Sequence, residues 1–138
     1  MGAEAVSDNW MKALGTSKDP LQDDWQRARR GLFLRAVTFA TKPSLRTGDR
    51  VVLYATGKGL VFAAGDVISI PYEEDGDSRW GWRVRVSLTH GTTYIHDGVP
   101  LERIEEERIL RNTIKRRSHI RLTDGEFEKA LELLPEMR

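Results

Sequence analysis

Two apolar runs joined by a glycine-rich turn dominate the hydrophobic pattern of the chain. The first runs from Val51 to Ala55 and the second from Leu60 to Ile68. Gly57 and Gly59 lie between them, and glycine readily adopts the positive φ of a tight turn. Neither run alternates with polar residues, so we expect two strands that are covered on both faces. The pattern predicts a β-hairpin in a small barrel or a helix-covered sheet, with Gly65 at a bulge where the second strand bends.

A second strand signal has the opposite character, because apolar and polar side chains alternate along it. The apolar positions are Trp80, Trp82, Val84, Val86 and Leu88, and the polar positions between them are Arg83, Arg85, Ser87 and Thr89. Such alternation is typical of a strand with one face on a core and one face in water.

Helical periodicity and capping signals account for most of the remaining chain. Leu21, Trp25, Ala28 and Leu32 recur at helical spacing and predict a helix over Leu21–Leu34. Thr123 and Glu126 match a capping box, which predicts a helix that ends near Pro135. The further expected elements are short strands at Asn9–Leu14 and His119–Leu122, a charged helix at Leu101–Leu110, and an ambiguous segment at Val37–Lys42.

Composition narrows the possible function classes. The chain has 138 residues, no cysteine and a formal net charge of +1. This length suits one domain, expected over residues 9–138 after a flexible tail at 1–8. The lack of cysteine removes disulfides, thiolate catalysis and sulfur-ligated zinc, and is compatible with the cytoplasm. We expect no membrane span, because no apolar run has the required length.

The order of these segments is similar to that of the EVE domain, a member of the PUA-like group related to YTH domains. The matching pieces are LRTGDRVVLYA, FAAGDV, the alternating tryptophan and valines of WRVRV, and RRSHIRLT before the last helix. The resemblance covers nearly the whole chain. It implies an α+β fold, a PUA-like pseudo-β-barrel of about five to six strands flanked by two to three helices.

The resemblance also implies a non-catalytic function, the recognition of a modified base of DNA or RNA, or of the free base, in an aromatic pocket. Carried onto this chain, the resemblance points to Thr16, Ser17, Trp25 and Tyr54 as ligand-binding residues, and the alternating strand adds Trp80 and Trp82 as aromatic candidates. The chain has Leu14-Gly15-Thr16-Ser17 where typical members have Lys-Ser-Glu-Pro. In a competing interpretation the same aromatic residues simply fill the barrel core.

A basic segment follows Arg108 and contains no acid up to Arg121. Together with the first helix it supplies candidate phosphate contacts, namely Arg29, Arg30, Lys115, Arg116 and Arg117. The alternative interpretation is a solvated face that balances the glutamates of residues 102–107.

Two other function classes remain open. Some ASCH-type relatives resemble amidohydrolases that act on modified bases, and Lys12 with Thr16 and either Glu73 or Glu74 would then be the reactive set. A protein interaction module without a small ligand also fits, and a reader of this kind would need an effector protein as partner. We expect no metal and no cofactor. We also expect no catalytic pair at Ser118 and His119, because neighbours in a strand point to opposite faces.

Overall fold

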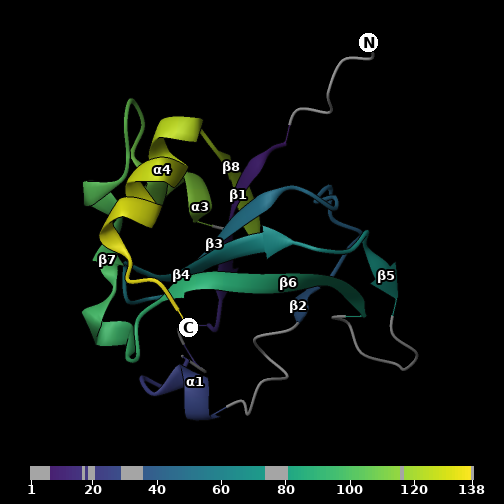
Figure 1. The fold of residues 1–138 in the computed structure, drawn as a ribbon, viewed down its shortest axis with the longest axis horizontal. Helices are drawn as coiled ribbons and strands as arrows, with labels where there is room; N and C mark the ends of the chain where they lie inside the picture. The colour runs from purple at the N-terminus through teal and green to yellow at the C-terminus, as the bar shows by residue number, and fades with distance from the viewer. Residues whose placement is uncertain are drawn as a thin grey trace.

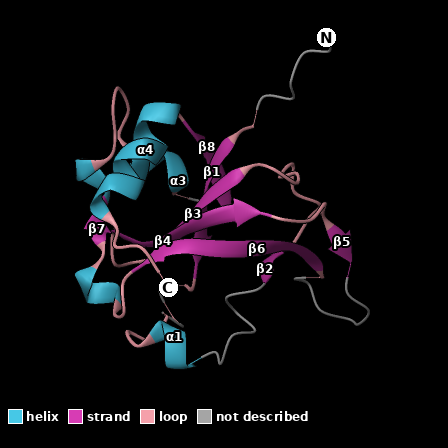
Figure 2. Ribbon diagram, in the orientation of Figure 1, coloured by secondary structure: helices cyan, strands magenta, loops and turns pink. Residues whose placement is uncertain are grey.

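The computed structural model describes residues 7–16, 18, 21–28, 36–73, 81–115 and 117–137. These residues form a curled mixed sheet that makes a half-barrel, with helices packed outside it (Figures 1 and 2). The expected α+β class is confirmed. Within the described residues, no helix has the length and apolar character needed to cross a membrane.

The main path of the sheet follows the order β2-β6-β4-β3-β1-β8, with β5 paired to β6 and β7 paired to β4. The strands are β1 (Asn9–Leu14), β2 (Ala36–Phe39), β3 (Arg50–Ala55), β4 (Leu60–Val67), β5 (Tyr72–Glu73), β6 (Trp82–Gly91), β7 (Val99–Pro100) and β8 (His119–Leu122). The helices are α1 (Trp25–Ala28), α3 (Leu110–Ile114) and α4 (Asp124–Leu133), with single 3-10 turns η1 (Ile95–Asp97) and η2 (Leu101–Arg103).

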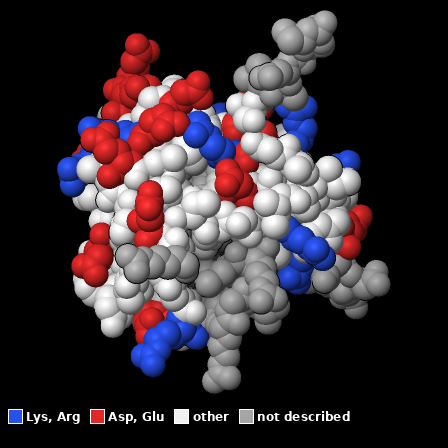
Figure 3. All heavy atoms as spheres, in the orientation of Figure 1, with Lys and Arg blue, Asp and Glu red and all other residues white. Residues whose placement is uncertain are grey.

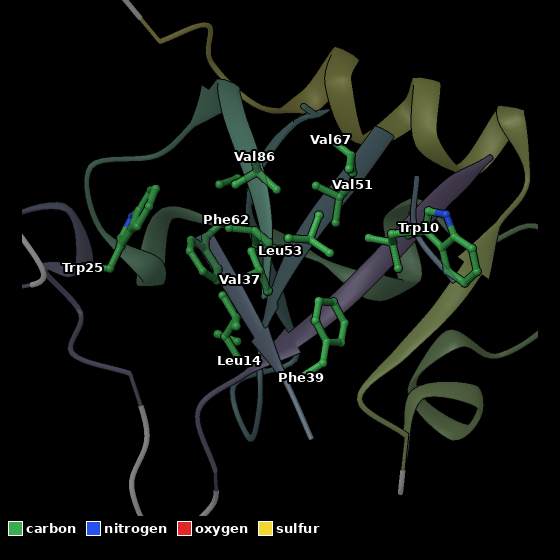
Figure 4. Packing of buried hydrophobic residues seen from close by; sticks show 14 of the residues in the cluster. Trp10, Leu14, Trp25, Val37, Phe39, Val51, Leu53, Phe62, Val67 and Val86 are labelled. Carbon is green, nitrogen blue, oxygen red and sulfur yellow. The ribbon is translucent and has the colours of Figure 1, made fainter. Parts of the chain in front are cut away.

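Two separate cores lie on the two faces of this sheet. Side chains from β3 alternate between them, so that Val51 and Leu53 enter one core while Val52 and Tyr54 enter the other. The inner core fills the concave side of the half-barrel and includes Trp10, Phe39, Phe62, Val84 and Val86 (Figure 4). The outer core lies beneath the helices and includes Met11, Leu101, Ile104, Leu110 and Phe127. The prediction that the central hairpin is covered on both faces is therefore confirmed.

The first strand joins the central hairpin to the C-terminal part of the chain. β1 pairs in parallel with β3 and antiparallel with β8. A buried carboxylate holds the start of this arrangement, because Asp49 accepts a hydrogen bond from the Trp10 indole at 2.9 Å. The same carboxylate accepts the backbone N–H of Asp8 and of Arg46, each at 3.0 Å. The Gly48-Asp49 turn before β3 thus fixes the register of three chain segments.

The helices confirm one sequence expectation and correct another. The capping box at the start of α4 is present, with Thr123 and Glu126 bonded reciprocally. The continuous helix expected over Leu101–Leu110 is wrong. The segment forms η2, leaves helical geometry, and begins α3 only at Leu110, whose backbone N–H donates to the Glu105 side chain at 3.0 Å. The segment thus forms two separate short helices in place of one. In this arrangement Leu101 and Ile104 are both buried in the outer core.

The helix expected at Leu21–Leu34 is shorter at its start, because the described part is helical only from Trp25. Residues 29–34 of that expectation lie outside the described residues. The alternation along β6 is confirmed from Trp82 onward, since Val84 and Val86 are buried while Arg85 and Ser87 are exposed.

Gly65 lies at a shift in register between β4 and β6, which confirms the predicted bulge. An added Cβ at this position would lie 2.2 Å from the backbone oxygen of Ser87. We expect Gly65→Ala to lower the free energy of unfolding by about 2–4 kcal/mol, since backbone must move to relieve the clash. Chemical denaturation followed by circular dichroism measures the change.

Gly57→Ala is the matched control for this substitution. Gly57 has a φ of +83° with nothing near its added Cβ, so backbone strain alone should cost about 1 kcal/mol. Equal losses at the two positions would show that the close approach of β4 and β6 at the bulge does not contribute.

Candidate functional site

Trp25 is a buried side chain at one end of the inner core. Only 1% of its surface is exposed, its indole N–H donates to the Thr92 carbonyl at 2.9 Å, and its ring meets Phe62 edge-on at 4.8 Å. Gln26 donates to the same carbonyl at 2.9 Å. A base would stack on Trp25 only if this packing opened.

Tyr54 lies on the opposite side of the sheet from Trp25. Its ring belongs to the outer core, and burial raises the pKa of its hydroxyl while the Arg111 guanidinium opposes that shift. The sheet separates the two aromatic residues, so they do not face a common slot.

The structure instead gathers an aromatic and cationic cluster around Lys12 on the inner face of β1. The Lys12 amine lies 4.4 Å from the centre of the Phe39 ring, and Phe39 meets the His119 ring edge-on at 5.0 Å. Lys12 and His119 are register partners on β1 and β8, and Phe39 and Trp82 are partners on β2 and β6. We call these four residues the Lys12 cluster. It brings together strands from both ends of the sheet path, which is why local sequence patterns did not reveal it.

Burial shapes the charge of the Lys12 cluster. Only 3% of Lys12 is exposed, and this desolvation lowers the pKa of its amine to about 8. Burial and then the neighbouring Lys12 amine lower the pKa of the His119 imidazole. At neutral pH the cluster therefore combines a neutral imidazole with an ammonium that gives up its proton easily.

The expectation that Ser118 and His119 point apart is wrong. The Ser118 hydroxyl lies 2.7 Å from His119 Nδ1, because Ser118 precedes β8 and does not follow the alternation of a strand. The hydroxyl holds the imidazole ring in place next to Lys12.

Several predicted site residues are exposed or lie outside the described residues. Thr16, Lys115 and Arg117 are exposed, and Trp82 is half-buried against the inner core, with the Lys42 amine 5.7 Å from its ring centre. Glu73 of the alternative reactive set is exposed and pairs with Trp82 in the register of β5 and β6. The predicted site residues that lie outside the described residues are Ser17, Arg29, Arg30, Glu74, Trp80 and Arg116.

Four exposed cations surround the end of β1 that follows Lys12, and we call them the basic rim: Lys58, Arg111, Lys115 and Arg117. Backbone bonds bring their segments together, since Thr56 donates to Leu14 at 3.0 Å and Ala13 donates to Ser118 at 2.9 Å. The Arg111 guanidinium lies against Gly59 in the turn between β3 and β4. Arg111 belongs to the basic segment that was predicted to bind phosphates, whereas Lys58 was not predicted, because it is far from that segment in sequence.

The cations of the chain differ in their acidic neighbours. Although burial opposes the shift, hydrogen bonds from His96 and then the charge of Lys58 lower the pKa of Asp23, so Lys58 of the basic rim has an acid nearby. Arg50, Arg108 and Arg121 bind carboxylates at 2.8, 3.3 and 3.4 Å. Within the described part of the chain, no ion pair involves a residue of the basic rim. Acidic side chains instead gather over α4 (Figure 3). The net charge of the chain is only +1, so the basic rim is a local concentration of positive charge.

An open groove of about 520 Å³ lies at the start of α4, away from these residues. It is lined by Glu106, Glu107, Arg108, Thr123 and Glu126. Arg108 is already bonded to the buried Glu126 carboxylate, and the remaining acids would repel a phosphate. The groove therefore does not suit nucleic acid.

Comparison with known proteins identifies the fold. No family model and no curated protein matches the chain. Among solved structures, protein Atu2648 from Agrobacterium tumefaciens is 18% identical with a TM-score of 0.60, covering 92% of this chain and 93% of its own. Rpa0253 from Rhodopseudomonas palustris is 15% identical with a TM-score of 0.56, covering 91% and 92%.

A third similar structure carries a named ligand. The YTH domain of Zygosaccharomyces rouxii MRB1, solved in complex with N6-methyladenosine RNA, is 11% identical with a TM-score of 0.54, covering 96% of this chain and 90% of its own. These likenesses show that the chain shares the fold of these proteins, including that of the YTH domain.

The titration of Lys12 provides a test of the cluster. Between pH 8 and 10 the unfolded chain holds more protons at Lys12 than the folded chain, because the folded pKa is about 8 against an ordinary 10.5. The free energy of unfolding should therefore rise with pH in this window, by up to roughly 3 kcal/mol. Lys12→Met should lack that rise. Urea unfolding of both proteins across the window measures the difference, and equal pH dependence would contradict the burial of the amine.

Proposed function

We propose that the chain is a non-catalytic nucleic-acid-binding domain that recognises a modified base, with the Lys12 cluster forming the base site. The observation that carries the proposal is the position of this cluster, in which aromatic rings and a buried ammonium lie on strands that backbone hydrogen bonds join to the segments of the basic rim. Base recognition needs aromatic faces for stacking and a few polar groups aimed at the base edge. Phosphate binding needs cations that acids have not neutralised.

The fold supports this proposal. A domain with the same fold has been solved bound to N6-methyladenosine RNA, and the ordered segments of this chain resemble the EVE domain of the same group. We propose EVE membership on that resemblance.

Each residue of the base site has a distinct proposed role. Trp82 is the half-buried aromatic residue of the cluster and offers a stacking face, while Phe39 forms the inner wall behind the Lys12 amine. Only 3% of Lys12 is exposed, so the packing around its amine must open before it donates a hydrogen bond to an acceptor on the base edge. Trp80 and Ser17 remain proposed contacts on the strength of the family resemblance.

The basic rim supplies the proposed contacts to the nucleic-acid backbone. Lys115 and Arg117 belong to the predicted phosphate set, and Lys58 and Arg111 extend it across the β3–β4 turn. Such contacts position the strand without reading its sequence.

Ligand-induced stabilisation tests the base site. We expect one modified nucleoside or a short oligonucleotide that contains it to raise the melting temperature, since a ligand at 100 times its Kd adds about 2.7 kcal/mol of stability. Trp82→Ala should weaken binding about tenfold or more, because stacking on one aromatic contributes about 1–3 kcal/mol. Tyr94→Ala removes another exposed aromatic residue, remote in sequence from the cluster, and serves as the matched control.

Other outcomes of that screen distinguish the competing functions. Chemical conversion of the base would favour the amidohydrolase interpretation, in which Lys12 is the reactive amine. The absence of any binding, with the fold intact by circular dichroism, would favour a protein interaction module.

Salt dependence tests the basic rim. For a single-stranded oligonucleotide, log Kobs should fall with log salt by about 0.7 for each phosphate contacted. Removing Lys115 or Arg117 by alanine substitution should reduce that slope by one contact each, while binding of the free nucleoside should not change. Lys129→Ala is the control, because Lys129 lies on α4 near Glu132 at 3.9 Å. If the rim substitutions leave the slope of log Kobs against log salt unchanged, the nucleic-acid backbone binds elsewhere on the protein.

A further inference from the structure

The outer face of the sheet is not covered uniformly by helices. α3 and α4 pack over β1, β3, β8 and the first part of β4, where the outer core lies (Figure 1). β5 and the start of β6 lie at the other end of the sheet, away from these helices (Figure 2). Val84 and Val86 enter the inner core, so the intervening Arg85 and the preceding Arg83 project from the outer face.

Two large apolar side chains are exposed beside these arginines. Ile68 is 54% exposed and Ile70 is 69% exposed. The Ile68 backbone N–H donates to the Arg85 carbonyl at 2.9 Å, and the Arg85 N–H donates to the Ser69 hydroxyl at 2.9 Å. These bonds hold the isoleucine segment against β6, so the two isoleucines do not belong to a free loop end.

Arg85 on this face contacts an aromatic ring, whereas one hydrogen-bond donor of Arg83 has no acceptor. The Arg85 guanidinium lies 5.4 Å from the centre of the Tyr72 ring, and Tyr72 is the register partner of Arg83. The Nε atom of Arg83 is buried and has no hydrogen-bond acceptor within the described part of the chain. A buried donor without an acceptor costs about 1–3 kcal/mol, which an incoming acceptor would recover.

Within the described residues, the acids beside these arginines form no ion pair with them; Glu74, Asp75 and Asp77, between β5 and β6 in the sequence, lie outside the described residues. Asp66 and Glu73 pair in register with Ser87 and Trp82, and both are exposed. Among the ion pairs of the described residues, neither carboxylate is joined to Arg83 or Arg85. Both basic and acidic side chains are visible on this side of the molecule near β5 (Figure 3).

We infer that Ile68, Ile70, Tyr72, Arg83 and Arg85, the isoleucine–arginine surface, dock an acidic segment of another protein that carries large apolar side chains. A carboxylate would take the unsatisfied Arg83 donor in the planar geometry that guanidinium favours, and apolar side chains of the partner would cover the isoleucines. Exposed apolar patches next to arginine are typical of protein interfaces.

A protein segment fits this surface better than nucleic acid does. Branched aliphatic side chains offer no flat face on which a base can stack. The basic rim lies beside the turn at the start of β4, whereas Ile68 follows the end of this eight-residue strand, about 25 Å away along its length. The inference does not depend on the proposed base site, and it gives a reader domain a separate surface through which an effector could be attached.

Nuclear magnetic resonance of the full chain, labelled with ¹⁵N, tests the inference with a short synthetic peptide in which leucine and glutamate alternate. We expect the peptide to shift the Arg83 Nε–H resonance together with the amides of Ile68 and Ile70. Versions with serine for leucine, or with lysine for glutamate, should each bind at least about tenfold more weakly.

Matched variants separate docking at this surface from nonspecific binding. Ile70→Ser should reduce affinity at least about tenfold, and Arg83→Lys should remove the dependence on glutamate. Ile109→Ser changes another isoleucine that is 58% exposed, after η2, and should leave the affinity unchanged.

Four results would overturn the inference. The first is the absence of peptide-induced shifts, and the second is an equal loss of affinity in the Ile70 and Ile109 variants. The third is that oligothymidylate shifts the same resonances and still does so in Ile70→Ser. The fourth is that these resonances shift with concentration in the protein alone. The third would identify a nucleic-acid surface, and the fourth would identify a contact between two copies of the chain.

Discussion

Burial of the central β-hairpin on both faces is the constraint on which the rest of the structure depends. β3 and β4 send alternate side chains into two cores, so each face of the hairpin needs its own cover. The helices cover the outer face, while the curl of the sheet brings β2 and β8 around the inner face. The bulge at Gly65 allows β4 to bend within this arrangement, and an added Cβ there would collide with the backbone of β6.

The same curl explains why a lysine is buried at the candidate site. Lys12 lies on the inner face of β1, where its neighbours in the sequence pattern are core residues such as Trp10 and Leu14. Burying an ammonium is costly unless other groups compensate, and the Phe39 ring provides part of that compensation. A cation held at this cost in an aromatic environment is typical of a functional position. The neighbouring imidazole of His119 remains neutral at neutral pH and therefore adds no repulsion there.

Much of the fold was predictable because its strongest signals are local. The apolar hairpin, the alternation along β6, the bulge at Gly65 and the capping box at Thr123 each follow from residues adjacent in sequence. The interruption of the helix expected at Leu101–Leu110 was not predictable, since the high helical propensity of this segment gives way to tertiary burial of Leu101 and Ile104. The expectation that Ser118 and His119 point to opposite faces failed because β8 begins at His119, so Ser118 does not have strand geometry.

The candidate site was harder to predict, because its members come from four strands that are distant in sequence. Trp25 and Tyr54 were reasonable aromatic candidates, but sequence periodicity cannot show that the sheet lies between them. Lys12 was noticed only for a catalytic alternative, and Lys58 joins the basic rim through the geometry of the β3–β4 turn. Charge pairing is similarly invisible in sequence. Arg108 and Arg111 belong to the same basic segment, yet only Arg108 is bound to a carboxylate.

The most direct test of the central claim is to follow the indole N–H resonances of the tryptophans while a modified nucleoside is added, with assignments made by single substitution. Recognition at the Lys12 cluster predicts that the Trp82 resonance shifts with saturation, and that the Trp25 resonance, bonded to Thr92 in the inner core, changes little. Saturable binding that moves the Trp25 resonance while leaving that of Trp82 unchanged would contradict the account and place the base site at the α1 end of the half-barrel.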